Sequence, residues 1–322
     1  MISRRYLRIK VMQAIYAKNY NTEEDIVAGE KKLDRSIQQC YELSFYFFSL
    51  FPIIKLYVEN KLEDRKNKNF PTELDLNPNT KFIQNAVIQQ IEDSTILKKK
   101  WKEYKINWYQ EKDLIAKIFT EISELPEYQT YMQTAETSYK TDKELVLAII
   151  EKVIAPSTLL HWYFEEKNLH WFNDYNDALL LTVQNILYWK PKQEQVPIQA
   201  MFKDPEADAA FYKNLYRKTI INGKEYLAII DAKLDNWEVD RIIETDMIIM
   251  KMALCEIMEF SEIPIKVTMN EYIDIAKSYG SLKSGTFING LLDKIAEDLR
   301  QAGKINKQGQ GLINKSLNQH ND

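Results

Sequence analysis

Glycine is scarce in this chain, with eight residues in 322, against an average usage of about 7%. Few sharp backbone reversals are therefore available, which argues against a many-stranded sheet and favours long helices joined by polar loops. Cysteine is scarcer still. Cys40 and Cys255 are the only two, so no disulfide framework is expected, and both thiols are predicted to be inert core residues in a reducing compartment.

Long apolar runs are also missing. The longest, Phe45 to Ile54, contains Pro52 and is followed by Lys55, so it is too short to cross a hydrocarbon core of about 30 Å as a helix. The chain begins with a charged segment rather than an apolar signal sequence. We therefore expect no membrane partner and a cytoplasmic location.

Signatures of enzymes are absent from the sequence. It contains no Walker-type loop, dinucleotide glycine fingerprint, nucleophile elbow or CxxC pair. His161 and Glu165 are spaced i, i+4 with His170 nearby, but a third convergent metal ligand is missing, so ordinary polar contacts are the preferred interpretation. We expect no catalytic residues, no metal and no cofactor.

The residues that are present predict an all-α protein. Apolar side chains recur at helical intervals through the middle of the chain, in the segments Leu33 to Leu62, Phe82 to Trp101, Leu114 to Ile122, Leu145 to Ile154 and Ala178 to Leu187. Five tryptophans lie between Trp101 and Trp189, and core packing is the preferred role for them over base stacking. The lysine run Lys98 to Lys100 is interpreted as an exposed helix face, with an RNA track as the alternative.

Two consecutive helices are predicted near the C-terminal end. Thr268 and Glu271 have the spacing of a capping box, which places a helix start at Thr268. Gly280 is predicted to end that helix in the left-handed conformation, and a second helix is predicted to open near Ser284.

The break between these helices is a candidate anion site. It gathers two lysines, three hydroxyls and one aromatic residue, namely Lys277, Lys283, Ser281, Ser284, Thr286 and Phe287. Phe287 suits a core position and a base-stacking position equally well. The pair Asn289-Gly290 weakens a helix by about 1 kcal/mol relative to alanine, which close packing or the approach of a ligand would explain.

A second basic cluster begins the chain. Arg4, Arg5, Arg8, Lys10 and Lys18 all precede the first acidic residue, Glu23. Cations at the start of a helix oppose its dipole at a cost of about 0.3–1 kcal/mol each, so a role in binding phosphate is the functional interpretation and a solvated terminus is the plain one. Helical spacing places Arg5, Ile9, Met12 and Tyr16 on the face that we expect to be anchored.

Both ends of the chain resemble a known family. The segments VTMNE (267–271), AKSYG (276–280) and FINGLLDKI (287–295), together with Pro264, are similar to the C-terminal signature of the bacterial antitermination factor NusB. SRRYLRIKVMQAIYA (3–17) resembles its arginine-rich first helix, and residues 211–230 and 237–264 resemble its third and fourth helices. The resemblance implies a NusB-like helical bundle of residues 1–20 and 206–300, enlarged by a mostly helical insertion of residues 21–205. Residues 301–322 read as a mobile tail.

The resemblance also implies a function. It predicts a non-catalytic transcription antitermination factor that binds boxA-type RNA of ribosomal transcripts together with the ribosomal protein NusE, within an RNA polymerase antitermination complex. The RNA-binding residues that it implies combine both basic clusters: Arg4, Arg5, Arg8, Lys10, Lys277, Ser281, Lys283, Ser284, Phe287 and Asn289. Tyr16 and Asp246 match positions near the NusE-facing surface.

Two alternatives stay open at this point. The overall charge of −4 favours a helical protein-interaction scaffold of the same fold that does not bind RNA directly. The other is the RNA-binding appendage of a ribosomal RNA cytosine methyltransferase, but no parallel-sheet cofactor domain follows the last matched helix.

Overall fold

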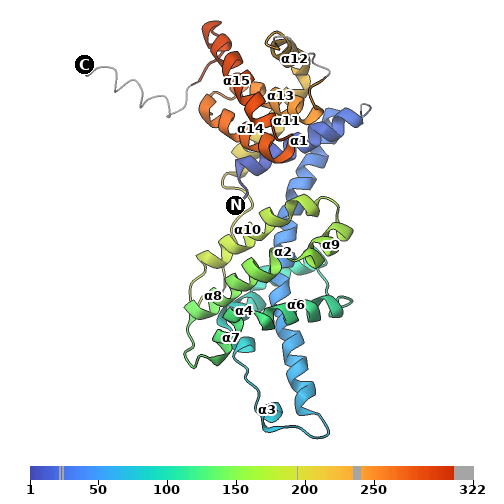
Figure 1. Ribbon diagram of the computed structural model, residues 1–322, viewed down its shortest axis with the longest axis vertical. Coiled ribbons are helices and arrows are strands. Elements are labelled where there is room, and N and C mark those ends of the chain that lie inside the picture. The colour runs from blue at the N-terminus through green and yellow to red at the C-terminus, as the bar shows by residue number, and fades with distance from the viewer. Residues whose placement is uncertain (22, 24, 194, 235–240, 308–322) are drawn as a thin grey trace, which may run out of the picture. The chain divides into compact units, whose positions relative to one another are not determined.

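The computed structural model describes residues 1–21, 23, 25–193, 195–234 and 241–307. Every regular element in these ranges is a helix and none is a strand, which confirms the predicted all-α class. The chain forms two compact units (Figure 1). We call Met1–Ile2 with Ser36–Met201 the middle unit, and Ser3–Arg35 with the chain from Phe202 onward the terminal unit. The expected division into residues 1–20 with 206–300 and an insertion of 21–205 stays a prediction.

The terminal unit is a helical bundle. Its helices are α1 (Arg4–Tyr20), the beginning of α2 (Ile26–Lys66), α11 (Pro205–Ile221), α12 (Gly223–Asp231), α13 (Glu244–Glu259), α14 (Ile265–Tyr279) and α15 (Ser284–Gln301). Helix α13 contacts α1, α11, α12, α14 and α15. Because it is surrounded, nearly all of its side chains from Ile248 to Ile257 are buried, as expected for a helix that is apolar on every side.

The side chain of Ser3 fixes the start of α1. Its Oγ accepts a hydrogen bond from the backbone N–H of Tyr6 at 3.1 Å, which satisfies one free donor of the first turn. The buried residues of α1 are Tyr6, Leu7, Arg8, Lys10, Val11, Met12 and Ile15. The expected anchored face was therefore wrong in part, since Arg5 and Tyr16 are exposed.

The middle unit is built around α2. Its smaller elements are α3 (Glu73–Leu76), η1 (Phe82–Gln84), α4 (Ala86–Asp93), α5 (Thr95–Glu103), α6 (Lys112–Glu124), α7 (Pro126–Gln133), α8 (Tyr139–Ile149), η2 (Ile150–Ile154), α9 (Thr158–Lys167) and α10 (Trp171–Tyr188). Aromatic residues of α2 form much of the core. The ring of Phe48 stacks on Trp189 at 5.5 Å, and that of Tyr46 meets Trp171 edge-on at 5.0 Å. The predicted core role holds for these two tryptophans, whereas Trp162 is exposed.

No single helix of the described residues is long and apolar enough to cross a membrane, although one pair, Tyr139–Ile154 with Thr158–Lys167, passes that test together despite a bend of 77°. Two sequence predictions fall partly outside the described residues. They are the first residues of the segment 237–264 and the tail from residue 308 onward. Within the described part, Lys307 Nζ donates to the carbonyl oxygens of Glu256 and Phe260 at 3.0 and 2.8 Å.

Candidate nucleic-acid interface

Arg8 is a buried cation of the terminal unit, with 3% of its side chain exposed. Its Nε and Nη2 donate to the two carboxylate oxygens of Glu256 on α13, at 2.8 and 2.7 Å. Burial alone would lower the pKa of Arg8, but the hydrogen bonds and charge of Glu256 raise it above the ordinary value. The predicted RNA-binding role of Arg8 therefore needs correction, because its guanidinium is used inside the protein.

The same carboxylate explains why α14 begins earlier than predicted. Glu256 also accepts hydrogen bonds from the hydroxyls of Thr268 and Tyr272, at 2.8 and 3.2 Å. Thr268 is thus a buried residue inside the helix, which begins at Ile265 after Pro264 without a side-chain cap. Burial of a carboxylate is tolerated when every lone pair has a partner. The predicted capping box was wrong.

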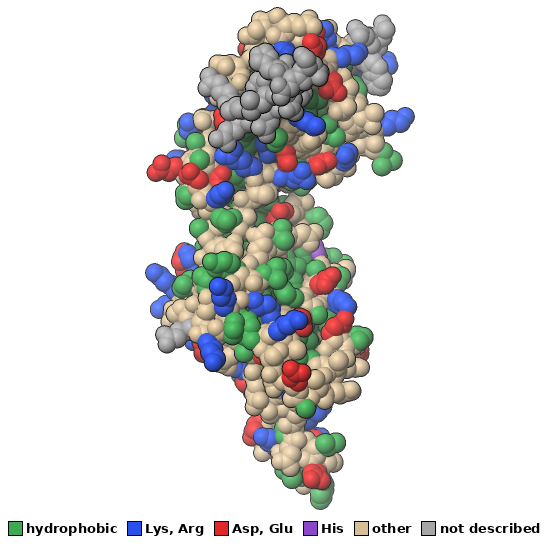
Figure 2. Space-filling model, turned by 90° about the vertical axis from the view of Figure 1, so that its left-hand side faces the viewer, with side chains coloured by type: hydrophobic (Ala, Val, Ile, Leu, Met, Phe, Trp, Pro, Cys, Tyr) green, Lys and Arg blue, Asp and Glu red, His purple; other side chains and the backbone are tan. Residues whose placement is uncertain are grey.

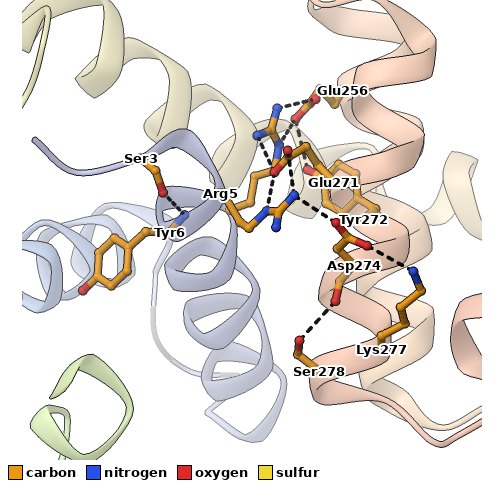
Figure 3. A network of polar contacts seen from close by, with 10 residues as sticks. Ser3, Arg5, Tyr6, Glu256, Glu271, Tyr272, Asp274, Lys277 and Ser278 are labelled. Atoms are coloured by element: carbon orange, nitrogen blue, oxygen red, sulfur yellow. Dashed lines mark hydrogen bonds and ion pairs between the residues drawn. The ribbon is translucent and has the colours of Figure 1, made fainter. Parts of the chain in front are cut away.

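Arg5 connects the start of α1 to α14. Its Nε and Nη2 donate to both oxygens of Glu271 at 2.9 and 3.0 Å, and Nη2 also donates to Asp274 at 3.0 Å (Figure 3). The hydrogen bond to Glu271 is the main reason that the pKa of Arg5 is raised. The side chain remains 47% exposed, so a bound anion can still reach it.

Asp274 extends this contact to Lys277. Lys277 Nζ donates to the other oxygen of Asp274 at 3.2 Å, as Figure 3 also shows. A Cβ at Gly285 would lie 3.0 Å from Lys277 Cγ, so Lys277 in turn packs against the first turn of α15. The first helix of the chain and the break between the last two helices therefore lie on one continuous patch.

Arg4 makes a longer ion pair than the shortest ones of Arg5 and Arg8. Its side chain is 42% exposed and its Nε lies 3.4 Å from Asp208. Together with Arg5 it lines a cavity of about 600 Å³, whose other walls are formed by α14 and the residues that precede it. Free backbone N–H groups of a first helical turn favour anions, so this end of α1 can accept a phosphate.

The α14–α15 break is closed by Ser284, which is buried. Ser284 Oγ accepts from the backbone N–H of Ser281 at 2.7 Å and donates to Asp246 Oδ2 at 2.6 Å. Gly280 is extended, with φ −96° and ψ −166°, so the predicted left-handed cap was wrong. A Cβ there would lie 2.5 Å from Ser284 Oγ and 2.6 Å from Asp246 Oδ1. The side chains of Ser284 and Asp246 approach the backbone so closely that position 280 requires glycine.

Next to the buried Ser284, the α14–α15 break also has exposed side chains. Ser281 and Lys283 are exposed, and Lys283 is the residue that precedes α15. Phe287 is half-buried and Asn289 is exposed on the first turns of α15. No atom lies within 4 Å of a Cβ built at Gly290. Close packing against Gly290 therefore does not explain the Asn-Gly pair.

Of the remaining predicted site residues, two are buried and one is exposed. Lys10 is 2% exposed, with its Nζ 5.4 Å from the centre of the Tyr6 ring, so it too is withdrawn from the surface. Asp246 is 5% exposed, and it accepts a hydrogen bond from the hydroxyl of Ser284. Tyr16 is 41% exposed and its ring lies 5.1 Å from that of Tyr20, which leaves it accessible to a partner.

Charges of both signs are interspersed on the face of the terminal unit that Figure 2 shows. Sequence reasoning missed the acidic partners of the α1 arginines, namely Glu256, Glu271 and Asp274. One signal was present, because Glu256 ends the apolar run DMIIMKMALCE, and a carboxylate in such a run needs a buried cation. The identity of that cation depends on folding.

Comparisons with known proteins identify relatives of this chain. The model of the NusB family matches residues 181–297. A transcription antitermination protein NusB of Salinibacter ruber is 44% identical over 103 residues, covering 32% of this chain and 64% of the relative. One of Chloroherpeton thalassium is 31% identical over 139 residues, covering 41% and 66%. One of Listeria monocytogenes is 36% identical over 101 residues, covering 31% and 77%.

The chain belongs to the NusB family. The NusB family is one of non-catalytic transcription antitermination factors, which agrees with the prediction that this chain is no enzyme. The family match begins within α10 and leaves out α1, so the position of the basic helix rests on its contacts with α11 and α13. The chain covers just under two thirds of the first two NusB relatives. No solved structure matches it.

A metal centre has no support in the described residues of this NusB family member. They contain no group of three or more His, Cys, Asp or Glu side chains that could hold an ion. His161 instead stacks on Tyr175 with ring centres 3.6 Å apart, and burial lowers the pKa of His161.

Proposed function

We propose that this chain is a non-catalytic RNA-binding factor of transcription antitermination. Membership of the NusB family and the printed names of three relatives support this. We propose further that its RNA is of the boxA type, that it binds this RNA together with NusE, and that both act within an RNA polymerase antitermination complex.

One observation carries the assignment of the RNA surface. Asp274 joins Arg5 of α1 to Lys277 of α14, with contacts of 3.0 and 3.2 Å. Cations that are more than 260 residues apart in the chain therefore share one patch. We assign the phosphate contacts to Arg4, Arg5, Lys277 and Lys283, since phosphate is bound by exposed cations and helix N-termini.

The phosphate contacts of Arg5 compete with its contacts to carboxylates of the protein. A phosphate that binds Arg5 competes with Glu271 and Asp274 for the same N–H donors. The contacts with Glu271 and Asp274 keep the Arg5 side chain ordered before RNA binds. This lowers the entropic cost of binding. The buried residues Arg8 and Ser284 stabilise this surface, because their hydrogen bonds fix the positions of α1 and of the α14–α15 break.

Base contacts are assigned to α15. Phe287 is half-buried and offers part of its ring, and Asn289 is exposed beside the open position at Gly290. Splayed bases of single-stranded RNA bind by stacking and by hydrogen bonds to amide side chains. Tyr16, on the other end of α1, is assigned to NusE.

A scaffold of the same fold without RNA binding is the second candidate. The pairing of Arg5 with two carboxylates favours it, because a cation that is neutralised internally attracts phosphate less strongly.

The test is fluorescence anisotropy of the full chain with labelled boxA-like RNA and a scrambled RNA, with and without NusE. Arg4→Ala and Lys283→Ala are compared with Arg300→Ala, which removes an exposed cation at the far end of α15 that pairs with Glu297. We expect weaker RNA binding for the first two variants only. Equal binding by all three variants contradicts this assignment of the RNA surface, and no binding of RNA by the natural chain supports the scaffold instead.

A further inference from the structure

The middle unit contains an open groove of about 740 Å³ that the proposed function does not use. One wall is a single face of α2, formed by residues four apart: Pro52, Leu56, Asn60 and Asp64. The opposite wall runs from the end of α5 to the start of α6, over Trp101, Trp108 and Tyr109.

Aromatic side chains dominate the second wall and are held at different depths. Trp108 is buried, and its Nε1 donates to Ser49 Oγ at 2.8 Å. Trp101 is half-buried and its Nε1 donates to the carbonyl oxygen of Phe45 at 3.0 Å. Tyr109 stands at the mouth with 77% of its surface exposed. A rigid floor with one free ring at the entrance is suited to a flat, unsaturated ligand.

The turn between α5 and α6 fixes Tyr109. Asn107 Oδ1 accepts a hydrogen bond from the backbone N–H of Tyr109 at 2.8 Å. Lys105 has a positive φ of 54°, an uncommon conformation for a residue with a side chain. Lys112 Nζ lies 5.6 Å from the centre of the Tyr109 ring. An exposed aromatic ring is thus held beside a cation.

The α5 side of the groove carries unneutralised positive charge. Lys98, Lys99 and Lys102 are exposed and have no ion-pair partner among the described residues. Lys100, by contrast, pairs with Glu103 at 3.0 Å. The groove itself is lined by one acid, Asp64, and one base, Lys112, and the unpaired lysines belong to α5, the helix that contributes Trp101 to its wall. Three unpaired lysines on the helix that ends at an aromatic groove complement an anionic chain with planar groups.

We propose that this groove binds single-stranded RNA, with a base stacked on Tyr109 and the backbone phosphates on Lys98, Lys99 and Lys102. Stacking on aromatic side chains beside a basic track is how proteins bind single strands without strict sequence preference. Asn60 is exposed at the groove and supplies an amide for a base edge. The site belongs to the middle unit alone and does not depend on the surface proposed for Arg4 and Lys283.

Photo-crosslinking of the full chain with a 4-thiouridine-labelled oligouridylate tests the location. We expect crosslinks in the peptide that spans the end of α5 and the start of α6. Crosslinks confined to α1 and α15 overturn the groove site and leave the proposed function standing. Crosslinks confined to the α5–α6 peptide support the groove site and leave the proposed function, which concerns boxA-type RNA, to its own anisotropy test.

Affinity measurements test the chemistry. Tyr109→Ala is expected to weaken oligouridylate binding by about tenfold, whereas Tyr109→Phe retains it. Tyr188→Ala is the matched control, because it removes an aromatic residue of the middle unit that is 61% exposed and does not line the groove. Equal affinity of Tyr109→Ala and Tyr188→Ala overturns the stacking role.

The lysines are tested by salt dependence. Changing Lys98, Lys99 and Lys102 together to alanine is expected to reduce the slope of log K against log salt by about 2, since each phosphate contact with a single strand contributes about 0.7. An unchanged slope overturns the phosphate track. Polyglutamate that displaces the RNA as effectively as an unlabelled oligouridylate also overturns the assignment, because the groove would then accept acidic protein.

Discussion

Replacing Arg8 by alanine tests how the terminal unit is held together. The change leaves Glu256, with 0% of its side chain exposed, without the guanidinium of Arg8 and removes two of its hydrogen bonds, of 2.7 and 2.8 Å. Removing one partner of a buried ion pair costs about 3–5 kcal/mol. Because domains are stable by only about 5–15 kcal/mol, Arg8→Ala should remove a large fraction of the free energy of unfolding.

Arg4→Ala is the matched control, because it removes the same side chain one turn earlier on α1. Arg4 is 42% exposed and makes one ion pair at 3.4 Å, so its removal should cost about 0–1 kcal/mol. Hydrogen exchange of α13 and α14 peptides, read by mass spectrometry, reports the stability of this unit separately from the middle unit.

A double variant distinguishes lost charge balance from lost packing. In Arg8→Met with Glu256→Gln, neither residue is charged, and the amide oxygen still accepts from Thr268. It should therefore be more stable than Arg8→Ala. The reasoning is refuted if Arg8→Ala exchanges no faster than Arg4→Ala, or if the double variant is the least stable of the three.

Three further predictions concern the α14–α15 break. Gly280→Ala should destabilise the terminal unit by about 1–3 kcal/mol in urea unfolding, because the added Cβ would lie 2.5 Å from Ser284 Oγ; unchanged stability contradicts the close approach. Burial raises the pKa of Asp246, so the folded state holds this proton more tightly than the unfolded state. Stability should then fall as the pH rises from the ordinary value of 3.8 through the folded pKa, and Asp246→Asn should flatten that part of the pH profile; an identical profile contradicts it. Gly290→Ala should raise the melting temperature, since alanine stabilises a helix interior by about 0.5–1 kcal/mol and open space surrounds the site. The same change should weaken RNA binding. Tighter binding by this variant contradicts a ligand contact at Gly290.

Local signals in the sequence were sufficient for helix content and for one boundary. The sequence predicted a second helix that opens near Ser284, and α15 begins at Ser284. These features depend on residues within one or two turns. The family resemblance was also correct, because it rested on long segments.

Signals that depend on distant partners were misread. Thr268 and Glu271 have capping-box spacing, but each has a stronger partner elsewhere in the unit, Glu256 and Arg5 respectively. A tertiary hydrogen bond to a charged group outweighs a local cap. The cluster of α1 cations likewise could not be divided by sequence into buried Arg8 and exposed Arg4, because the division depends on the carboxylate of α13.

The salt dependence of boxA-like RNA binding tests the central claim most directly, that α1 and the α14–α15 break form one RNA surface. The measurement compares the natural chain with a variant in which Arg4 and Lys283 are both alanine. Each contact of a cation with single-stranded RNA contributes about 0.7 to the slope of log K against log salt, so the variant should lose about 1.4. An unchanged slope in a folded variant contradicts the account.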